Sequence, residues 1–526
     1  MSMRLRLLTV GGTALVGTYS FYQDDIKRAT RPVIFWSQMF PIFAHYRFVE
    51  WRQNQFSKKD ELMSKKNDQE WSELHKHYAP KVLKVILDLG GIYIKVGQVL
   101  ATRPDVAPEI YREVFKVLLD GVPGICGETA RQMVKDGLGS DIETVFSEFN
   151  DVPIAAASIA QVHKAKLLDG KDVVIKIQHP NAFEMFKSDI QTVSRFVRLA
   201  QPEQAIIMDE LEKQFFMEFD FEREAWALST IHKNMKRVAP HIKVPLPVPG
   251  LVKTNIFVMD YIPGVKLIDA VMENASKQAS RFGYTLEQFQ EAAKNPSILF
   301  TTRYLLDQAW TKILGGLCSI YNFAFGFLGR IEIEPTKYNI RKLYNELLYI
   351  QGHQILIDGI FNGDPHPGNI LVTPQGNLGL IDYGQVKVIS RKDRRDLAKL
   401  ILLLAEGVSK KDETIALAKE LGFETMKGND FVMYKTCVIG LDRDDLEITE
   451  GKGIQAYMEY LDSLDRTKTI PEQYVMAVRS CIILRGMAAV LGPNHPPISI
   501  CNEWKKLAQE AIKRFPPGEE DGIMPN

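Results

Sequence analysis

Residues 362–369, with the letters NGDPHPGN, constrain this chain more than any other segment. Asp364 and Asn369 stand five residues apart in this loop, and Asp382 opens an Asp-Tyr-Gly triplet shortly after it. Carboxylate and amide oxygens are the ligands that Mg²⁺ prefers, and phosphoryl transfer needs them beside a carboxylate that serves the acceptor. The spacing predicts a magnesium–nucleotide site, with Asn369 and Asp382 on the metal and Asp364 as catalytic base or orienting group.

A simpler reading treats these residues as ordinary turn formers, because Asp, Asn and Gly are common in turns. An Asp-x₄-Asn pattern alone would favour that reading. A short hairpin is predicted between the loop and Asp382, with strands at 370–373 and 378–382, and it argues strongly against the turn-former reading. A catalytic loop followed by an Asp-aromatic-Gly element is the order found in kinases.

A lysine stands in a β-branched stretch upstream. Residues 172–178 (DVVIKIQ) follow an Asp-Gly turn and an alternating segment at 158–167, which predicts a β-hairpin. Lys176 then lies on the second strand, as the kinase lysine does, and is expected to meet the α/β-phosphates and a helical glutamate. Glu224 is the predicted catalytic partner, and Glu222 is the alternative.

The loop before this hairpin carries alanines in place of a glycine-rich motif. Ala155, Ala156, Ala157 and Ser158 stand where a GxGxxG loop would cover the phosphates. Alanine lacks the freedom of glycine at positive φ and adds a methyl group next to the phosphate. These four residues are predicted to contact a nucleotide whose geometry differs from that in a typical protein kinase.

The order of predicted elements defines the fold class. Helices dominate to about residue 148, a β-rich segment follows, with strands at 158–167, 172–178 and 255–262 and helices at 183–200 and 202–238, and the rest is helical apart from a break at 362–390. This order predicts an α+β, bilobal, protein-kinase-like fold.

Met259 and Tyr261, at the end of the last strand of the small lobe, are expected to contact the nucleotide. The predicted segments are a targeting or membrane-anchor segment (1–30), a helical extension (31–148), an N-lobe (149–263), a helical C-lobe (264–515) with an insertion at about 283–335, and a flexible tail (516–526).

Charge and cysteine usage exclude some classes. Lys and Arg total 65 and Asp and Glu total 65, so no overall field attracts nucleic acid, and none is expected as a partner. The five cysteines show no metal-ligand spacing. They are expected to be buried thiols in a reducing compartment.

Two uncharged stretches raise the question of a membrane. Residues 7–23 contain no charge and follow Arg4 and Arg6, with no acid before Asp24. This pattern predicts a mitochondrial targeting or anchoring segment, with another membrane anchor (a plastid one included) or a frayed terminus as alternatives. Residues 313–329 are also uncharged and are either a buried hairpin or a lipid-contacting element.

Four motifs together resemble the UbiB/aarF family of atypical kinases, over about residues 75–500. They are the alanine-rich loop AAASIAQVHKA at 155–165, KVGQ at 95–98, EFD at 218–220 and DPHPGN at 364–369. The uncharged N-terminus and Leu484-Arg485-Gly486 resemble the mitochondrial aarF-domain branch most.

The resemblance implies more than the residues alone do. Lys95 and Gln98 would project from the KxGQ helix into the nucleotide site, where Glu218 and Asp220 would interact with that helix. ATP or ADP with Mg²⁺ would be bound and ATP hydrolysed, in support of coenzyme Q or isoprenoid-lipid metabolism or of mitochondrial lipid homeostasis. Membrane association is implied, with lipid or quinone-biosynthesis proteins as partners.

One departure and two alternatives remain open. Asn362 replaces the histidine expected two residues before Asp364, which puts the bracing of the catalytic loop in question. A non-catalytic, nucleotide-gated scaffold would need the same metal ligands. A small-molecule phosphotransferase would share the catalytic loop, although the KxGQ and ExD motifs argue against it.

Overall fold

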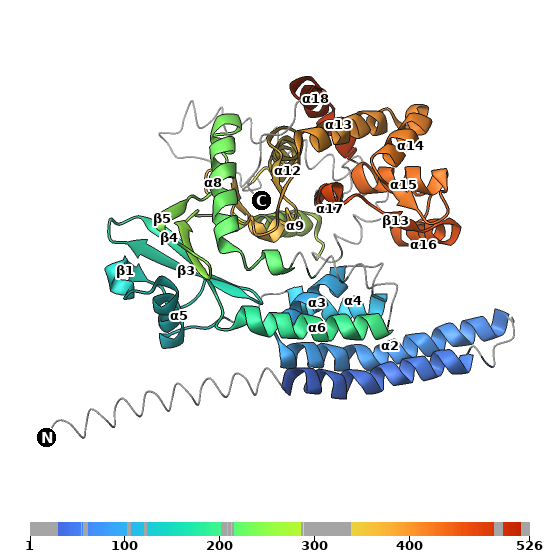
Figure 1. The fold of residues 1–526 in the computed structure, drawn as a ribbon, viewed down its shortest axis with the longest axis horizontal. Helices are drawn as coiled ribbons and strands as arrows, with labels where there is room; N and C mark the ends of the chain where they lie inside the picture. Colours follow the sequence, from blue (N-terminus) through green and yellow to red (C-terminus); the bar gives the residue numbers. More distant parts are fainter. Residues whose placement is uncertain are drawn as a thin grey trace. The chain divides into compact units, whose positions relative to one another are not determined.

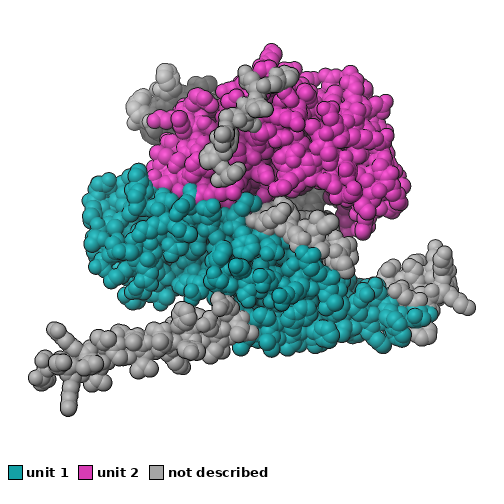
Figure 2. Space-filling model, in the orientation of Figure 1, with its two compact units in different colours: residues 1–222, 248–259 teal, residues 223–247, 260–526 magenta. Residues whose placement is uncertain are grey.

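A computed structural model describes residues 30–53, 55, 61–102, 107–119, 124–200, 208, 212, 215–285, 288, 338–488 and 498–516. The chain divides into two compact units, and each is described by itself (Figure 2). Unit 1 comprises residues 1–222 and 248–259, and unit 2 comprises residues 223–247 and 260–526.

Unit 1 is built on a β-sheet whose centre is an antiparallel hairpin. The strands run in the order β1-β3-β4-β6-β5, with β2 paired to β3 (Figure 1). Gly170, at φ +85°, allows the turn between β3 and β4, and Val162 stands opposite Lys176. The predicted hairpin is confirmed. The strands are β1 (Phe146–Phe149), β2 (Ala155–Ala156), β3 (Ala160–Leu167), β4 (Asp172–Gln178), β5 (Pro247–Lys253) and β6 (Ile256–Asp260).

Helix α5 (Glu128–Leu138) covers one face of this sheet. Its Met133, Val134 and Leu138 pack on the alternating side chains of β4 and β6 in one core cluster. Gly137 permits the close approach, because a Cβ there would lie 3.1 Å from Ile177 and from Ile256. Alternate side chains of the strands are thus buried beneath α5 on one face of the sheet.

Further helices and 3₁₀ turns complete the described part of unit 1. The helix of residues 30–53, called here the first helix, runs beside α2 in Figure 1. Tyr46 ties the two together, since its hydroxyl bonds His75 Nδ1 at 2.8 Å and Tyr111 of α4 at 3.0 Å. Among the others are α2 (Glu61–Leu89), α3 (Ile92–Thr102), α4 (Glu109–Phe115), η1 (Lys116–Leu119) and α6 (Ala182–Ala200).

Unit 2 is mostly helical and holds short two- and three-stranded sheets around the catalytic loop. The order β10-β9-β7 forms one sheet, and β11 pairs with β8. The predicted hairpin at 370–382 is confirmed, with its strands ending at Val372 and Leu380. The strands are β7 (Val265–Lys266), β8 (Ile360–Asn362), β9 (Ile370–Val372), β10 (Leu378–Leu380), β11 (Val386–Val388), β12 (Glu424–Thr425) and β13 (Thr467–Thr469).

The helices of unit 2 surround these strands. They pack closely: a Cβ on Gly352 would lie 2.5 Å from the Trp504 ring, which places α12 directly against α18. The helical elements are α8 (Phe221–Val238), α9 (Leu267–Phe282), α12 (Ile340–His353), η4 (Gln354–Asp358), η5 (Pro367–Asn369), α13 (Arg391–Ala405), η6 (Gly407–Lys410), α14 (Lys411–Glu420), α15 (Asp430–Leu441), α16 (Ile454–Leu464), α17 (Glu472–Ala488) and α18 (Ile500–Arg514).

The α+β class is confirmed, and three local predictions are wrong. Residues 146–149 form strand β1 where a helix was expected, because they pair with β3. The helix predicted over 202–238 is interrupted by a turn at 218–220, before α8 begins at Phe221. Cys126 is exposed, whereas Cys437, Cys481 and Cys501 are buried as expected.

Several predictions lie outside the described residues. They concern residues 1–29, the cysteine at 318, most of the insertion at 283–335 with its uncharged stretch, and the tail from residue 517. Within the parts of the chain that the structure describes, no helix combines the length and apolar character needed to cross a membrane.

Candidate nucleotide site

Asn362, at the end of β8, joins the catalytic loop to the segment that carries Asp382. Its side-chain oxygen accepts the backbone N–H of Asp364 at 2.8 Å, and its amide donates to the Asp382 carbonyl at 3.0 Å. Its own carbonyl accepts bonds from Gln351 at 2.7 Å and Ser480 at 3.3 Å. Asparagine therefore braces the loop where a histidine was expected, and the bracing that the sequence put in question is present.

The register of the β9–β10 hairpin brings the two predicted metal ligands to one edge. Ile370 pairs with Leu380, so Asn369 and Ile381 flank that pair, and the Ile381 N–H donates to the Asn369 carbonyl at 3.4 Å. Asp382 follows at once, and its Oδ1 accepts the Gly384 N–H at 2.9 Å. Both side chains are partly exposed. An amide oxygen and a carboxylate at this edge form a hard-oxygen donor set.

Glu224 lies close to the same triplet within unit 2. Its side chain is 1% exposed, and a Cβ placed on Gly384 would be 3.8 Å from its Oε2 and 3.3 Å from Asp382 Oδ1. The alternative glutamate, Glu222, belongs to unit 1, is exposed, and lies 3.5 Å from the Thr254 hydroxyl. Burial favours Glu224 as the glutamate of this site, because a buried carboxylate needs a cationic partner.

Arg479 of α17 contacts the predicted catalytic aspartate. Its guanidinium lies 3.3 Å from Asp364 Oδ2 and donates to Gln385 Oε1 at 3.0 Å. Asp364 is about one quarter exposed. The carboxylate is thus oriented from the helical side of unit 2, by a residue more than a hundred positions downstream.

Two buried residues, Gly363 and Tyr383, are closely packed beside the catalytic loop and the Asp382 segment. Gly363 is buried, and a Cβ there would lie 2.9 Å from the Met476 sulfur, so no larger residue fits without displacement. Tyr383 is buried, accepts a bond from Gln354 at 3.1 Å, and its pKa is raised by burial. Gln354 opens a π-helical turn, a local irregularity that often accompanies functional sites.

In unit 1, Lys176 lies in an aromatic environment on β4. Its ammonium is 5.3 Å from the centre of the Phe221 ring and 5.8 Å from that of Phe257. Such contacts stabilise a cation on a largely apolar strand. The predicted pairing of Lys176 with Glu224 would join residues of different units and stays a prediction.

The alanine-rich loop is a short strand followed by a turn. Ala155 and Ala156 pair with Val162 and Gln161 of β3, and the Ala157 N–H donates to the Ala160 carbonyl at 2.8 Å. No residue between 153 and 159, all of them described, has a positive φ. The loop therefore adopts a backbone that alanine tolerates, and Ala155, Ala157 and Ser158 are at least partly exposed.

A buried polar relay fixes the segment before α5 to strand β3, next to this loop. Gln161 accepts the Ile125 N–H and donates to the Ile125 carbonyl, both at 2.8 Å, and also contacts His163 Nε2 at 2.6 Å. His163 Nδ1 bonds the Asn150 carbonyl at 2.8 Å. Both side chains are at most 1% exposed, and each finds the partners that a buried polar group needs.

The KxGQ and ExD residues meet within unit 1. Lys95 donates to both carboxylate oxygens of Glu218 at 2.5 Å, and Gln98 donates to the Leu118 carbonyl at 2.8 Å. Asp220 is exposed at the turn before α8. The structure thus joins Lys95 to Glu218, as the resemblance implied.

Met259 and Tyr261 lie on either side of a unit boundary. Met259 ends the unit 1 part of β6 and is 6% exposed, and Tyr261 is partly exposed in unit 2. Their predicted contact with the nucleotide stays a prediction.

Sequence reasoning missed Arg479, Gln161 and His163. Arg479 is one arginine in a long helical stretch, and nothing in its local pattern marks it. The other two could have been noticed, because polar residues at Gln161 and His163 alternate onto the inner face of a strand, where a buried partner is required.

The comparisons with known proteins agree with the motifs. The model of the ABC1 atypical kinase-like domain matches residues 117–290 and 330–415. AarF domain-containing protein kinase 1 of Gallus gallus is 26% identical over 442 residues, covering 80% of this chain and 72% of that protein. ACTIVITY OF BC1 COMPLEX KINASE 8, chloroplastic, of Arabidopsis thaliana is 27% identical over 423 residues, covering 78% of this chain and 51% of that protein.

A solved structure of a Mycobacterium tuberculosis protein in complex with erythromycin is 22% identical, with a TM-score of 0.42, and covers 85% of this chain and 98% of that one. The family match rests on the domain model and the relatives. The chain belongs to the ABC1/AarF family of atypical kinase-like proteins.

Proposed function

We propose that this protein binds ATP or ADP with Mg²⁺ and hydrolyses ATP, and that transfer of phosphate to proteins is not its main activity. The observation that carries the proposal is the Asn362 bridge, which holds the backbones of Asp364 and Asp382 in one arrangement. A loop of ordinary turns would not need one side chain that hydrogen-bonds both the catalytic loop and the segment of Asp382.

The residues of unit 2 fit a magnesium–nucleotide complex. Asp382 and Asn369 would hold the ion, and Asp364 would orient or deprotonate the attacking water. When bound, Mg²⁺ would neutralise charge that develops on the phosphate oxygens. Among the described residues no group of three or more His, Cys, Asp or Glu side chains could by itself hold a metal ion. A pair of protein ligands nonetheless suits Mg²⁺, which often keeps waters and substrate phosphates as its other ligands.

Hydrolysis is favoured over protein phosphorylation by the residues around this set. Alanines replace the glycine loop that usually covers the phosphates, and Lys95 and Glu218 hold the KxGQ helix by an ion pair within unit 1. The resemblance implies that this helix would lie where a peptide substrate binds in other kinases.

Phosphate release from the purified full-length chain tests the proposal. We expect Mg²⁺-dependent release that Asp364→Asn lowers by at least about 10²-fold, as loss of a catalytic base does. Asp364→Asn should still bind MgATP, whereas Asp382→Asn should lose Mg²⁺-dependent binding. Equal release by the wild type and Asp364→Asn would show that the activity does not come from this site.

The scaffold alternative has its own signature. Tight MgATP binding by the wild type without phosphate release, with and without anionic vesicles, would favour a nucleotide-gated scaffold. Ala155→Gly adds a further probe, because it restores backbone freedom in the loop. We expect it to shift the preference between ATP and ADP, and unchanged affinities would contradict a function of the loop in nucleotide geometry.

The cellular setting is proposed from the family. We propose an organellar, membrane-associated protein, in mitochondria, that supports coenzyme Q or isoprenoid-lipid metabolism or lipid homeostasis, with lipid or quinone-biosynthesis proteins as partners. The uncharged, acid-free segment at 7–23 supports an organellar location, and the Arabidopsis relative is named chloroplastic. Deletion of residues 1–29 from a tagged chain should abolish organelle import; unchanged import would contradict this location.

A further inference from the structure

The first helix presents two apolar faces. Phe35, Met39, Ile42 and Val49 are buried, and Phe35 stacks on Tyr93 with ring centres 5.3 Å apart. A second set of apolar residues faces solvent on the opposite side. It consists of Val33, Phe40, Phe48 and Trp51, each more than half exposed, with Ala44 between them.

These exposed residues form a stripe along one side of the helix, where the exposed polar residues Thr30 and Ser37 also lie. At 3.6 residues per turn, positions 33, 40, 44, 48 and 51 fall within a sector of about 80°. Soluble helices normally carry polar residues on the face away from the core. Three exposed aromatic rings in one row on a single helix form a patch of the kind that marks an interaction surface.

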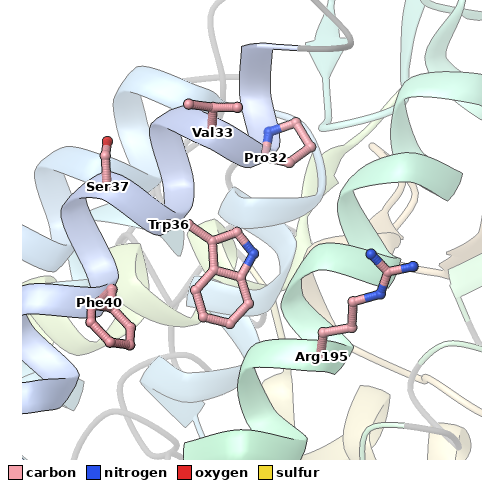
Figure 3. Close-up of a pocket in the computed structure, with 6 residues that line it drawn as sticks. All are labelled: Pro32, Val33, Trp36, Ser37, Phe40 and Arg195. Atoms are coloured by element: carbon pink, nitrogen blue, oxygen red, sulfur yellow. The ribbon is translucent and has the colours of Figure 1, made fainter.

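A basic row lies beside this stripe on α6. Lys187, Arg195 and Arg198 are exposed at positions that also share one side of their helix, against a single acid, Glu184. The two helices meet at an open groove lined by Pro32, Val33, Trp36, Ser37, Phe40 and Arg195 (Figure 3). Val33 and Phe40 of the stripe and Arg195 of the basic row line the same groove, so the two sets share one border. Trp36 of the first helix faces Arg195 across it (Figure 3).

We propose that this surface, the stripe of the first helix with the basic row of α6, docks on an anionic phospholipid bilayer. Aromatic rings favour the headgroup level of a membrane, and exposed Lys and Arg attract its phosphates. Residues 1–23 contain no acid and residues 7–23 no charge, which suits the same lipid surface; Asp24 and Asp25 stand between this stretch and the first helix. A protein partner would use aromatic anchors too, but neither the basic row nor the acid-free leader would be required.

This surface shares no residue with the proposed nucleotide site, so its test does not depend on the proposed activity. The full-length chain is mixed with vesicles of phosphatidylcholine, with or without phosphatidylglycerol. Hydrogen exchange of peptides from residues 30–53 is then compared with and without lipid. We use this readout together with flotation, because residues 7–23 alone could hold the chain on vesicles.

We expect anionic vesicles to protect the exposed stripe, and neutral vesicles to protect it less. The variant Phe40→Ser/Phe48→Ser/Trp51→Ser should lose that protection and bind about tenfold more weakly, since three interfacial rings are removed. A matched control, Val408→Ser/Met426→Ser/Leu446→Ser, removes three even more exposed apolar residues from unit 2 and should bind as the wild type does.

The basic row is tested independently. Lys187→Gln/Arg195→Gln/Arg198→Gln should reduce the preference for anionic vesicles and the sensitivity to salt, whereas Lys392→Gln/Lys506→Gln/Lys513→Gln, at exposed positions of unit 2, should change neither. The proposal is wrong if anionic vesicles leave peptides 30–53 unprotected. It is equally wrong if protection appears without lipid and rises with protein concentration, because a second copy would then cover the stripe.

Discussion

Arg479 lies 3.3 Å from the carboxylate of Asp364 and also donates to Gln385, so one guanidinium ties the catalytic loop to the segment after Asp382. Both partners of the ion pair are partly exposed, at 34% and 24% of their side-chain area. Exposed pairs of this kind contribute about 0–1 kcal/mol to stability. The pair therefore matters for the direction of the carboxylate more than for folding, and Arg479 is a positioning residue.

Arg479→Ala should lower kcat for ATP hydrolysis by about tenfold, because the Asp364 carboxylate loses the group that orients it. The KM for ATP and the melting temperature should change little. Arg479→Lys keeps the charge but not the two-pronged geometry. Its kcat should lie between those of the wild type and Arg479→Ala. Phosphate-release kinetics and thermal melts measure these effects. An unchanged kcat in Arg479→Ala would show that the contact is a surface ion pair without a function in catalysis.

Asn362→Ala should remove both hydrogen bonds that link Asp364 to Asp382. A lost hydrogen bond that leaves a partly buried group unpaired costs about 1–3 kcal/mol, so unit 2 should melt at a lower temperature and kcat should fall. Asn362→Asp is the matched control, because it keeps the acceptor for the Asp364 N–H but cannot donate to the Asp382 carbonyl.

The control separates the two halves of the bridge. If the link to Asp382 matters, Asn362→Asp should resemble Asn362→Ala in both kcat and melting temperature. A wild-type kcat in both variants would mean that the loop is held by the other bonds to Asn362, those from Gln351 and Ser480 to its backbone.

The local chemistry of the site could be predicted from the sequence because its groups are close along the chain. Asp364, Asn369 and Asp382 lie within twenty residues, and the hairpin between them has clear strand and turn signals. Lys176 was likewise marked by a β-branched strand. Period-two and turn patterns specify such units without knowledge of the rest of the fold.

What could not be predicted depends on distant packing. Arg479 reaches Asp364 over more than a hundred residues, and only the tertiary fold brings α17 to the loop. The local sequence of β1 favours neither a helix nor a strand. It forms a strand because it hydrogen-bonds to the edge of β3. The turn at 218–220 replaces a helix where Glu218 turns towards Lys95 and Phe219 packs on Phe183.

Gly97 in the KxGQ motif allows α3 to pack against its neighbours. A Cβ there would lie 2.4 Å from Leu118 and 3.2 Å from Ile86, both buried. Gly97→Ala should destabilise unit 1 by about 1–3 kcal/mol through overpacking, despite the better helix propensity of alanine. Gly486→Ala, in α17 with no atom within 4 Å of the new Cβ, is the control and should be neutral or stabilising. Equal melting temperatures for the wild type and Gly97→Ala would contradict the tight packing of this helix.

His163 makes the relay in unit 1 sensitive to pH. Burial lowers its pKa, while the bond to the Asn150 carbonyl and the charge of Asp151 oppose that shift. The Gln161 amide donates towards Nε2, so this nitrogen must be unprotonated, and the proton sits on Nδ1. Protonation would place two donors face to face and release Gln161 from its position.

The sign of the effect follows from the lowered pKa. The unfolded chain binds a proton at His163 below about pH 6.5, whereas the folded chain resists it, so stability is full above that value and is lost as the pH falls through it. His75 and His179 also have lowered pKa values and act in the same direction. A measurement specific to the relay is therefore required.

Hydrogen exchange at the Ile125 amide gives that measurement, because this N–H donates to Gln161 at 2.8 Å. Corrected for its intrinsic rate, exchange should accelerate as the pH falls below about 6.5, towards the lowered pKa at which folded His163 takes up a proton. The amide of Leu167, at the other end of β3, donates to the Lys171 carbonyl at 2.9 Å; it serves as the internal control and should stay protected. In His163→Gln, which cannot titrate, the Ile125 amide should lose this dependence on pH. A pH dependence that persists in His163→Gln would assign the effect to another group and leave the relay as a purely structural contact.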